Sequence, residues 1–351
     1  MTGSSFGKAF NISTFGESHG KGIGVIIQGC PPGLILTKDI IQKELDKRKP
    51  GKKNSLSSKR KEPDTAVIMS GTFNNKTTGT PIMILIENKD ADSSAYFQNK
   101  DLFRPGHGDI TYFAKYGIRD YRGGGRASAR ETAARVAAGA VAQIILDDYD
   151  IRIQTYTIEF GSIKAHNFDF NENFTNFLEC PDNNALKKME EKIKLVKKQG
   201  DSIGGVVEIR VFNPPAGLGE PVFDKLDADI AKALMSIGSV KGVEIGAGYQ
   251  ASQLKGSENN DQITNNGFLT NNSGGILAGI SNGDDIIARA FIKPIPSITK
   301  PLKTIDITGR EVEISTKGRH DVSAIPRINP VCKAMMAITI ADHLLRQKLN
   351  Q

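Results

Sequence analysis

Arg122, Arg126 and Arg130 surround or follow a run of three glycines, just before a stretch of helix-forming residues. Residues 119–131 read RDYRGGGRASARE. Glycine lets a backbone adopt positive φ and approach a ligand closely, and a helix N-terminus offers free N–H groups and partial positive charge to an anion. Arginine adds forked donors that match phosphate or carboxylate. The segment therefore predicts an anion-binding loop, with a flexible loop of solvated arginines as the alternative.

Two histidines lie in short, turn-forming segments and could exchange protons. His19 follows Glu17-Ser18 and precedes a glycine, and His107 lies in the sequence RPGHG at 104–108. The ordinary imidazole pKa of ~6.5 permits proton transfer near neutral pH. Adjacent residues of an extended chain point to opposite sides, so Ser18 and His19 do not form a nucleophile and base through adjacency alone. A hydrolase is therefore disfavoured, and a solvated loop histidine is the alternative for His107.

Two further loops carry positive charge. Residues 317–321 read KGRHD and lead through Arg327 towards the C-terminal helix, much as the first loop leads into its own helix. Residues 293–297 read KPIPS, and their two prolines exclude a regular helix because proline lacks the backbone donor. The second of these segments is expected to be a stiff, extended loop with one cation.

The elements that must position these loops are a mixture of strands and amphipathic helices. Residues 23–28 and 81–87 predict strands, and alternation over 206–212 predicts a half-buried strand with one face in water. Without a strict strand–helix–strand alternation, the order of elements favours the α+β class. The predicted helices cover 128–147, 181–199, 224–237 and the stretch that begins at Asn329-Pro330.

Three local features refine the helix predictions. Ser128 and Glu131 match a capping box, in which each side chain binds the other residue's backbone N–H. Asn329 and Pro330 suit an N-cap followed by the first helical residue. The small residues of 137–140 would let another element approach that helix closely.

The composition indicates one large domain, residues 1–351, because no linker, repeat or long low-complexity tract divides the chain. The N-terminus has no basic leader or apolar segment, and no apolar run reaches the ~18 residues of a membrane span. The three cysteines are dispersed and show no zinc-site or disulfide spacing. We expect a cytoplasmic protein with reduced thiols, no membrane contact and no metal.

Positive charge is concentrated near the N-terminal end. The net charge is +7, and residues 43–62 hold nine Lys or Arg against three Asp or Glu. Such a window is consistent with a solvated face, a nucleic-acid contact or a rim that attracts a polyanionic small substrate. A nucleic-acid-binding protein is disfavoured, because the chain has no tryptophan, the Arg-Gly-Gly unit is not repeated, and no aromatic series accompanies the basic window.

Three long segments together resemble the signature regions of the chorismate synthase family, in the same order. They are 15–20 (FGESHG) with 29–33 (GCPPG), the run 103–139, and 317–326. Shorter matching phrases link them, including 215–221 (PAGLGEP) and 240–245 (VKGVEI). The resemblance covers nearly the whole chain.

The resemblance implies an enzyme that converts 5-enolpyruvylshikimate 3-phosphate to chorismate, by 1,4-elimination of phosphate and a ring proton. The family requires reduced FMN although no net redox change occurs, and an external flavin reductase or another donor would supply the electrons. Some members also reduce FMN with NADPH, which is a possible added activity. The family further implies a β-α-β sandwich, with helices between antiparallel sheets, and a homotetramer.

The resemblance also assigns roles to individual residues. His19 corresponds to the histidine that protonates the departing phosphate, His107 to the one that supports the reduced flavin, and Asp321 to the aspartate implicated in proton removal. The candidates for contact with FMN are Arg126, Ala127, Ser128, Gly238, Ser239, Ala278, Lys293, Pro294, Ile295, Pro296, Ser297 and Arg319. The candidates for binding substrate anions are Arg48, Arg130 and Arg327.

The chain departs from the family pattern at a few positions. Asn54-Ser55 stands where an arginine is frequent, and nearby lysines lack the bidentate fork of arginine. Lys333 replaces a usual glutamate, and Ala278 a usual glycine. Since neither histidine is affected, we expect these departures to change affinity more than reaction class.

Overall fold

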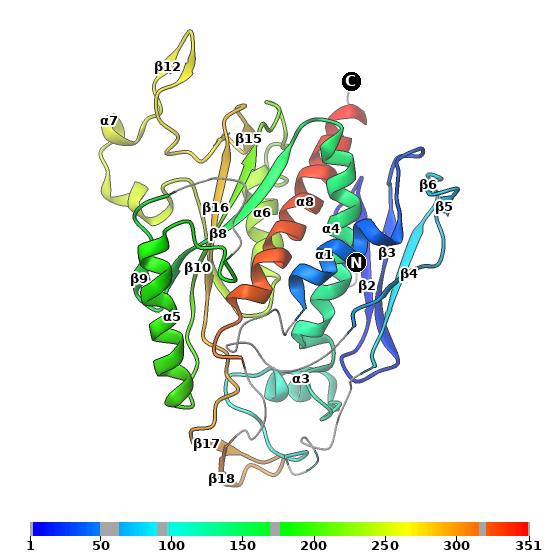
Figure 1. The fold of residues 1–351 in the computed structure, drawn as a ribbon, viewed down its shortest axis with the longest axis vertical. Coiled ribbons are helices and arrows are strands. Elements are labelled where there is room, and N and C mark those ends of the chain that lie inside the picture. The colour runs from blue at the N-terminus through cyan, green and yellow to red at the C-terminus, as the bar shows by residue number, and fades with distance from the viewer. Residues whose placement is uncertain are drawn as a thin grey trace.

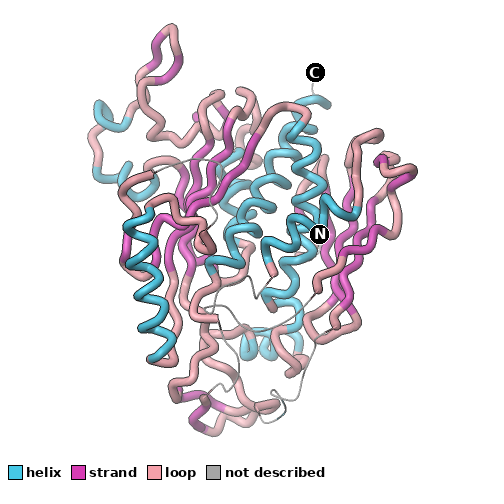
Figure 2. Tube along the Cα trace, viewed as in Figure 1, coloured by secondary structure: helices cyan, strands magenta, loops and turns pink. Residues whose placement is uncertain are grey.

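Two antiparallel sheets enclose a layer of helices in the computed structural model (Figure 1, Figure 2). The structure describes residues 3–49, 63–89, 97, 99–168, 176–315 and 321–349. The α+β class and the placement of helices between antiparallel sheets are both confirmed. The basic window beyond residue 49 and the loop 316–320, which includes Arg319, lie outside the described residues.

The first sheet has five strands in the order β1-β2-β3-β7-β4. They are β1 (Ser5–Phe6), β2 (Asn11–Gly16), β3 (Gly22–Gln28), β7 (Ile82–Glu87) and β4 (Ala66–Ile68). Ile27 of β3 lies opposite Ile12 and Ile82 of its neighbours, and all three side chains are buried against the helices. The two strands predicted at 23–28 and 81–87 are therefore β3 and β7.

The second sheet also has five strands, in the order β11-β16-β10-β8-β9. They are β11 (Val240–Ile245), β16 (Ile286–Ile292), β10 (Gly205–Phe212), β8 (Arg152–Phe160) and β9 (Ile163–Lys164). The predicted strand at 206–212 is β10, but the face that was expected to lie in water is partly buried. Glu208 is only 2% exposed, because Arg210 and Arg289 bind its two carboxylate oxygens at 2.7 and 2.9 Å and cover it.

The helical layer consists of α1 (Lys38–Arg48), α4 (Thr132–Asp147), α6 (Leu226–Met235) and α8 (Ile325–Leu349). α8 packs against the other three, and it also contacts β8 and β10, while α4 contacts β3 and β7. α5 (Asn183–Lys198) stands beside β9, at the edge of the second sheet (Figure 1). Each predicted helix is present, but α4 begins at Thr132 rather than at 128, and α5 and α6 start two residues later than expected.

Shorter elements form the connections. They are α3 (Asp109–Tyr116), α7 (Gly256–Asn259), the 3₁₀ turns η1 (Gly125–Ala127), η2 (Ala129–Glu131) and η3 (Gly248–Gln253), and the paired strands β5 (Thr72–Phe73) with β6 (Lys76–Thr77), β12 (Ile263–Thr264) with β13 (Gly267–Phe268), β14 (Ile276–Leu277) with β15 (Ile280–Ser281), and β17 (Leu302–Ile305) with β18 (Glu311–Ile314).

The expected start of the last helix is wrong. α8 begins at Ile325, so Pro330 lies inside the helix rather than at its first position. Asn329 does not cap it: the Asn329 amide donates to the backbone oxygen of Leu178 at 3.1 Å and to the hydroxyl of Thr157 at 3.3 Å. Packing against β8 thus recruits the asparagine side chain for a contact across the core.

The small residues at 137–140 have the predicted effect, since α8 approaches α4 closely at Gly139. A Cβ on Gly139 would lie 2.4 Å from the Cβ and 2.6 Å from the Cα of Ala334. We expect Gly139→Val to lower the free energy of unfolding by about 1–3 kcal/mol or more, because the two helices must separate. Gly256→Val is the control, because no atom of the described residues lies within 4 Å of a Cβ at this exposed position. Equal urea-unfolding free energies for the two variants would contradict the close packing.

Candidate active site

Four chain segments that are distant in sequence meet at one end of the helical layer. They are the turn between β2 and β3, the loop before α3, the glycine-rich loop before α4, and the loop that follows β16 (Figure 1, lower end). α4 and α8 both begin at this end, so the N–H groups of two helix starts face the same region. The convergence brings together His19, His107, Arg126 and Lys293.

The glycine-rich loop ends in a short 3₁₀ turn before α4 begins. Ser128 is its N-cap, and its hydroxyl accepts from the backbone N–H of Arg130 at 3.2 Å. The expected capping box is wrong, because the backbone N–H of Glu131 donates to the Ser128 backbone oxygen and that of Ser128 donates to Gly125. The Glu131 carboxylate instead accepts from Thr14 at 2.7 Å and from Arg135 at 2.8 Å.

The arginines of this loop are not simply solvated. Arg126 donates to the backbone oxygens of Gly16 and Thr14, both at 3.1 Å, and to the Thr14 hydroxyl at 2.7 Å. It thereby ties the loop to the end of β2. Arg122 forms a forked pair with Asp120, and its side chain remains 49% exposed.

His19 lies directly above the backbone of Gly123. A Cβ on Gly123 would stand 2.7 Å from Cδ2 and 2.8 Å from Nε2 of the imidazole, and 3.2 Å from the Ser18 hydroxyl. Gly123 has φ +91°, so both the contact and the backbone conformation require glycine. The Ser18 hydroxyl oxygen is buried and has no hydrogen-bond partner among the described residues. The imidazole of His19 therefore packs against the surface of the glycine-rich loop.

His107 is partly buried and lies against the loop after β16. Its Nδ1 is 3.2 Å from the backbone oxygen of Pro105, and its Nε2 is 3.0 Å from the Ser297 hydroxyl. Burial, and then the charge of Arg104, lower the pKa of His107 to about 4. The imidazole is thus neutral at neutral pH. Since a carbonyl oxygen only accepts, Nδ1 carries the proton and Nε2 accepts from Ser297.

This low pKa makes folding stability depend on pH. Between about pH 6.5 and pH 4 the unfolded chain protonates this imidazole, whereas the folded protein does not, so stability falls as pH falls through that range. The contribution is at most about 3 kcal/mol. Urea unfolding at pH 7, 5.5 and 4.5 should show a smaller loss for His107→Gln than for the natural chain. Parallel losses in the two proteins would contradict a depressed pKa.

A buried carboxylate that sequence reasoning missed joins two of the candidate arginines. Asp64 is 0% exposed and accepts from Arg48 Nη1 at 2.9 Å and from Arg130 Nη1. Arg48 is 1% exposed, and its other nitrogens donate to the Thr132 hydroxyl at 3.0 Å and to the backbone oxygen of Ala129 at 2.9 Å. Burial lowers the pKa of Arg48 to about 9. Arg48 thus stabilises the start of α4 through its hydrogen bonds to Thr132 and Ala129.

The remaining arginine candidate, Arg327, lies close to this cluster. Its charge is the largest electrostatic contribution that lowers the pKa of Arg48, after burial. Its Nη1 lies 3.3 Å from Asp321, and its Nε is buried with no hydrogen-bond partner among the described residues. The structure therefore gathers Arg48, Arg130 and Arg327 near one another, with Asp321 beside them.

Most of the flavin candidates also converge. Lys293 donates its backbone N–H to Ser239 and its Nζ to the oxygen of Gly106, both at 2.9 Å. Pro296 faces the same glycine, since a Cβ there would lie 2.8 Å from the Pro296 Cβ. The loop 293–297 and the turn at 238–239 therefore adjoin the His107 loop.

Ala278 is not brought to this group within the chain. It lies in the turn between β14 and β15, where Gly279 accepts from the backbone N–H of Leu226 at the start of α6. Gly238 follows the other end of α6, and ten helical residues span about 15 Å. β15 is accordingly at the upper end of Figure 1, opposite the site.

Lys333, one of the departures from the family pattern, lies beside a carboxylate in the structure. It projects from α8 towards α1. Burial there lowers the pKa of Lys333 below its ordinary value, and the charge of Glu44 offsets only part of this effect. Lys333 and Glu44 line the same small cavity between α1, α4 and α8. The pair lies inside the helical layer, whereas residues 54–55 lie outside the described residues.

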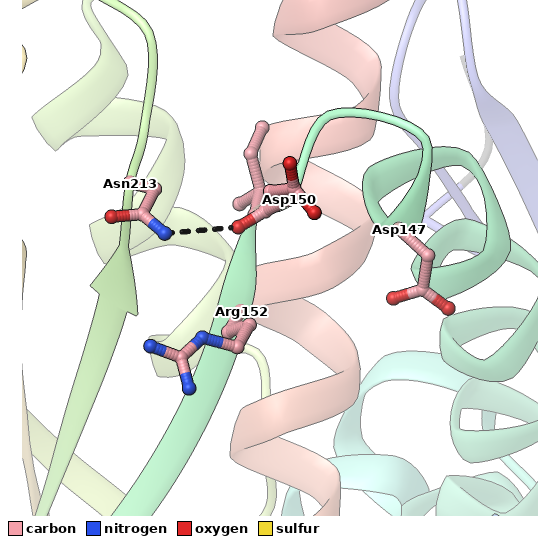
Figure 3. Close-up of a pocket in the computed structure, with 5 residues that line it drawn as sticks. Asp147, Asp150, Arg152 and Asn213 are labelled. Carbon is pink, nitrogen blue, oxygen red and sulfur yellow. Dashed lines mark hydrogen bonds between the residues drawn. The ribbon is translucent and has the colours of Figure 1, made fainter.

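An open depression lies at the far end of α4 and contains none of the candidate residues. Asp147, Asp150, Ile151, Arg152 and Asn213 line it. Asn213 donates its amide to the backbone oxygen of Asp150 at 3.2 Å (Figure 3). The described residues contain no group of three or more His, Cys, Asp or Glu that could hold a metal ion, and none of their helices is long and apolar enough to span a membrane.

Comparison with known proteins identifies the family. The family model "Chorismate synthase" matches residues 10–345. The chorismate synthase of Desulfosudis oleivorans is 62% identical over 348 residues, covering 99% of this chain and 98% of the relative, and that of Desulfatibacillum aliphaticivorans is 57% identical, covering 99% and 97%. A solved structure titled "Crystal Structure of Chorismate Synthase" matches with a TM-score of 0.75 and 32% identity, covering 97% of this chain and 93% of that one. The chain therefore belongs to the chorismate synthase family.

Proposed function

We propose that the protein is a lyase that forms chorismate from 5-enolpyruvylshikimate 3-phosphate by 1,4-elimination of phosphate. The observation that carries the proposal is the convergence of His19, His107 and a cluster of arginines at one end of a chain that matches chorismate synthases over its full length. The substrate carries a phosphate and two carboxylates. Guanidinium groups and helix starts are suited to bind such anions.

Reduced FMN is the proposed cofactor, and the described residues fit it. Among the described residues, the buried Ser18 hydroxyl has no hydrogen-bond partner, and a Cβ on Gly125 or Gly238 would meet no atom within 4 Å. Arg126, Lys293 and Ser297 supply positive charge and a hydroxyl nearby, and Ala127, Ser128, Ser239 and 294–296 complete the proposed contacts. Bound reduced FMN would lend electron density to the substrate ring without net oxidation. Arg319 and Ala278 remain proposed FMN contacts. Arg319 lies outside the described residues, and Ala278 lies beyond the other end of α6.

Three residues are proposed to be catalytic, two of them by transferring protons. His19 donates a proton to the departing phosphate, since its imidazole stands at the surface of the anion-binding loop. Neutral His107 supports the flavin, with Nδ1–H held by Pro105 and Nε2 in contact with Ser297. Asp321 removes the ring proton, and it lies 3.3 Å from Arg327 in the arginine cluster.

The arginines differ in the role that their surroundings support. Arg327 keeps a donor, its Nε, for a substrate anion. Arg130 has a 10% exposed side chain and spans Asp64, Asn88 and the backbone of Glu87. Buried Arg48 contributes to the positive field and holds Arg130 in place through Asp64. We infer that substrate contact falls to Arg327 and Arg130.

We further propose that the chain forms one domain, acts in the cytoplasm as a homotetramer, and receives its reduced flavin from an external reductase or another donor. An added NADPH:FMN reductase activity is the alternative source of electrons. Steady consumption of NADPH with FMN in the absence of any other enzyme would establish that activity.

An anaerobic assay tests the proposed function. Full-length protein, chemically reduced FMN and 5-enolpyruvylshikimate 3-phosphate should release phosphate and form chorismate in equal amounts. Omitting the reductant should abolish both products. If reduced FMN binds but neither product forms, the proposed function is wrong.

A further inference from the structure

One arginine side chain connects the two segments that carry the histidines. Arg104 lies three residues before His107, whose backbone N–H donates to the Arg104 oxygen at 3.2 Å. The Arg104 guanidinium donates through Nη2 to the backbone oxygen of Gly123 at 3.1 Å. Gly123 is the residue over which His19 lies. The position of Arg104 therefore affects both imidazoles.

Asp109 holds that guanidinium in one orientation. Its carboxylate accepts from Arg104 Nε at 2.7 Å, from Arg104 Nη2 at 2.8 Å and from the Arg104 backbone N–H at 3.1 Å. Both side chains are less than 10% exposed. Burial raises the pKa of Asp109, but the hydrogen bonds from Arg104 hold it below its ordinary value, so the carboxylate stays ionised. A forked, buried pair of this kind defines geometry more strictly than a surface pair.

Arg119 shares the same carboxylate but donates its other hydrogen bonds to a different segment. Its Nη1 lies 3.0 Å from Asp109, whereas its Nη2 donates to the backbone oxygens of Lys100 at 2.6 Å and Leu102 at 2.7 Å. Arg119 is 8% exposed, close to the 9% of Arg104. The two arginines are thus matched in burial and in partner, and only Arg104 reaches Gly123.

The charged groups around His107 come from its own loop, the start of α3 and the loop after β16. Arg104 and Lys293 disfavour the protonated imidazole, and Asp109 favours it. Arg104 has the largest electrostatic effect of the three. The same side chain that places the imidazole therefore also acts on its charge.

We propose that Arg104, oriented by Asp109, is a positioning residue that sets the placement of His107 relative to His19. The proposal rests on the proposed function of the site. Because the Arg104 charge disfavours the protonated imidazole, its loss should also raise the pKa of His107. Loss of the two parallel hydrogen bonds to Asp109, with the positive charge kept, should change only the placement of the His107 imidazole.

Three variants separate these effects. Arg104→Gln should lower kcat about tenfold or more, change KM less than about threefold, and raise the pKa of His107 by about one unit. Arg104→Lys keeps the charge but loses the fork, so it should lower kcat while leaving that pKa low. Arg119→Gln, the matched control, should reduce stability without raising the pKa. The pKa of each histidine in the full-length protein can be followed by mass spectrometry of hydrogen exchange at the imidazole C2 position.

The outcomes distinguish this inference from the proposed function. If Arg104→Gln and Arg119→Gln lower kcat equally and leave His107 titrating as in the natural chain, Arg104 is only structural and the proposal is overturned. If the natural chain forms no chorismate, the proposed function fails instead. In that case the exchange measurements still decide whether Arg104, and not Arg119, controls the protonation of His107.

Discussion

His19→Ala should lower kcat for chorismate formation at least about tenfold, and by about 10²-fold if proton donation to the phosphate limits turnover. The imidazole lies against the backbone of Gly123, whose missing side chain makes room for it. Removing the ring leaves the loop backbone free to keep its conformation. The free energy of unfolding should therefore change little while the rate falls.

The control for this variant is His166→Ala. His166 is exposed beyond β9, and its backbone N–H donates to the Asp182 carboxylate at 3.0 Å. The same substitution there should leave kcat and KM unchanged. Steady-state rates measured anaerobically with reduced FMN compare the two variants. A near-normal rate for His19→Ala in a folded protein would remove His19 from the mechanism.

Asp64→Ala should lower the free energy of unfolding by about 3–5 kcal/mol, because it leaves a buried guanidinium without its counter-charge. Arg48 is 1% exposed and Arg130 is 10% exposed at the side chain, so water cannot readily replace the carboxylate. The two arginines would also repel each other across the vacated position. Since Arg48 binds Ala129 and Thr132, the start of α4 should loosen and activity should fall as well.

Asp46→Ala provides the comparison for the stability measurement. Asp46 lies on the exposed side of α1, where its carboxylate is 54% exposed and pairs with Lys49. Removing an exposed carboxylate of this kind should cost less than about 1 kcal/mol. Urea unfolding of both variants at pH 7 measures the difference. If Asp64→Ala costs no more than Asp46→Ala, the buried cluster contributes no net stability.

The helices and strands were largely predictable because their signals are local. The period of apolar residues along α5 and α6, and the strand-forming residues of β3 and β7, depend only on neighbours in the chain. The small residues around Gly139 likewise predicted a close approach. The start of α8 was not predictable, because the Asn329 side chain is recruited by Leu178, which lies 151 residues away.

The candidate site shows the same division. The glycine-rich loop, both histidines and the stiff loop at 293–297 could be selected from residue type and turn chemistry, and the resemblance to the family assigned their roles. Nothing local marks Asp64 as a partner of Arg130, which is 66 residues further along the chain, or Asp109 as the group that orients an arginine beneath His19. Nor does the position of Ala278 in sequence reveal that α6 separates it from Gly238.

The sequence by itself determined the class of fold, the family and the residues capable of proton transfer and anion binding, because these follow from residue type, local spacing and long motifs. Only the tertiary structure decided which arginines are buried on a carboxylate and which keep a donor for substrate. It also decided that His107 is neutral. The physical reason is that burial and counter-charges control ionisation and hydrogen bonding, and both are supplied by segments that meet only when the chain is folded.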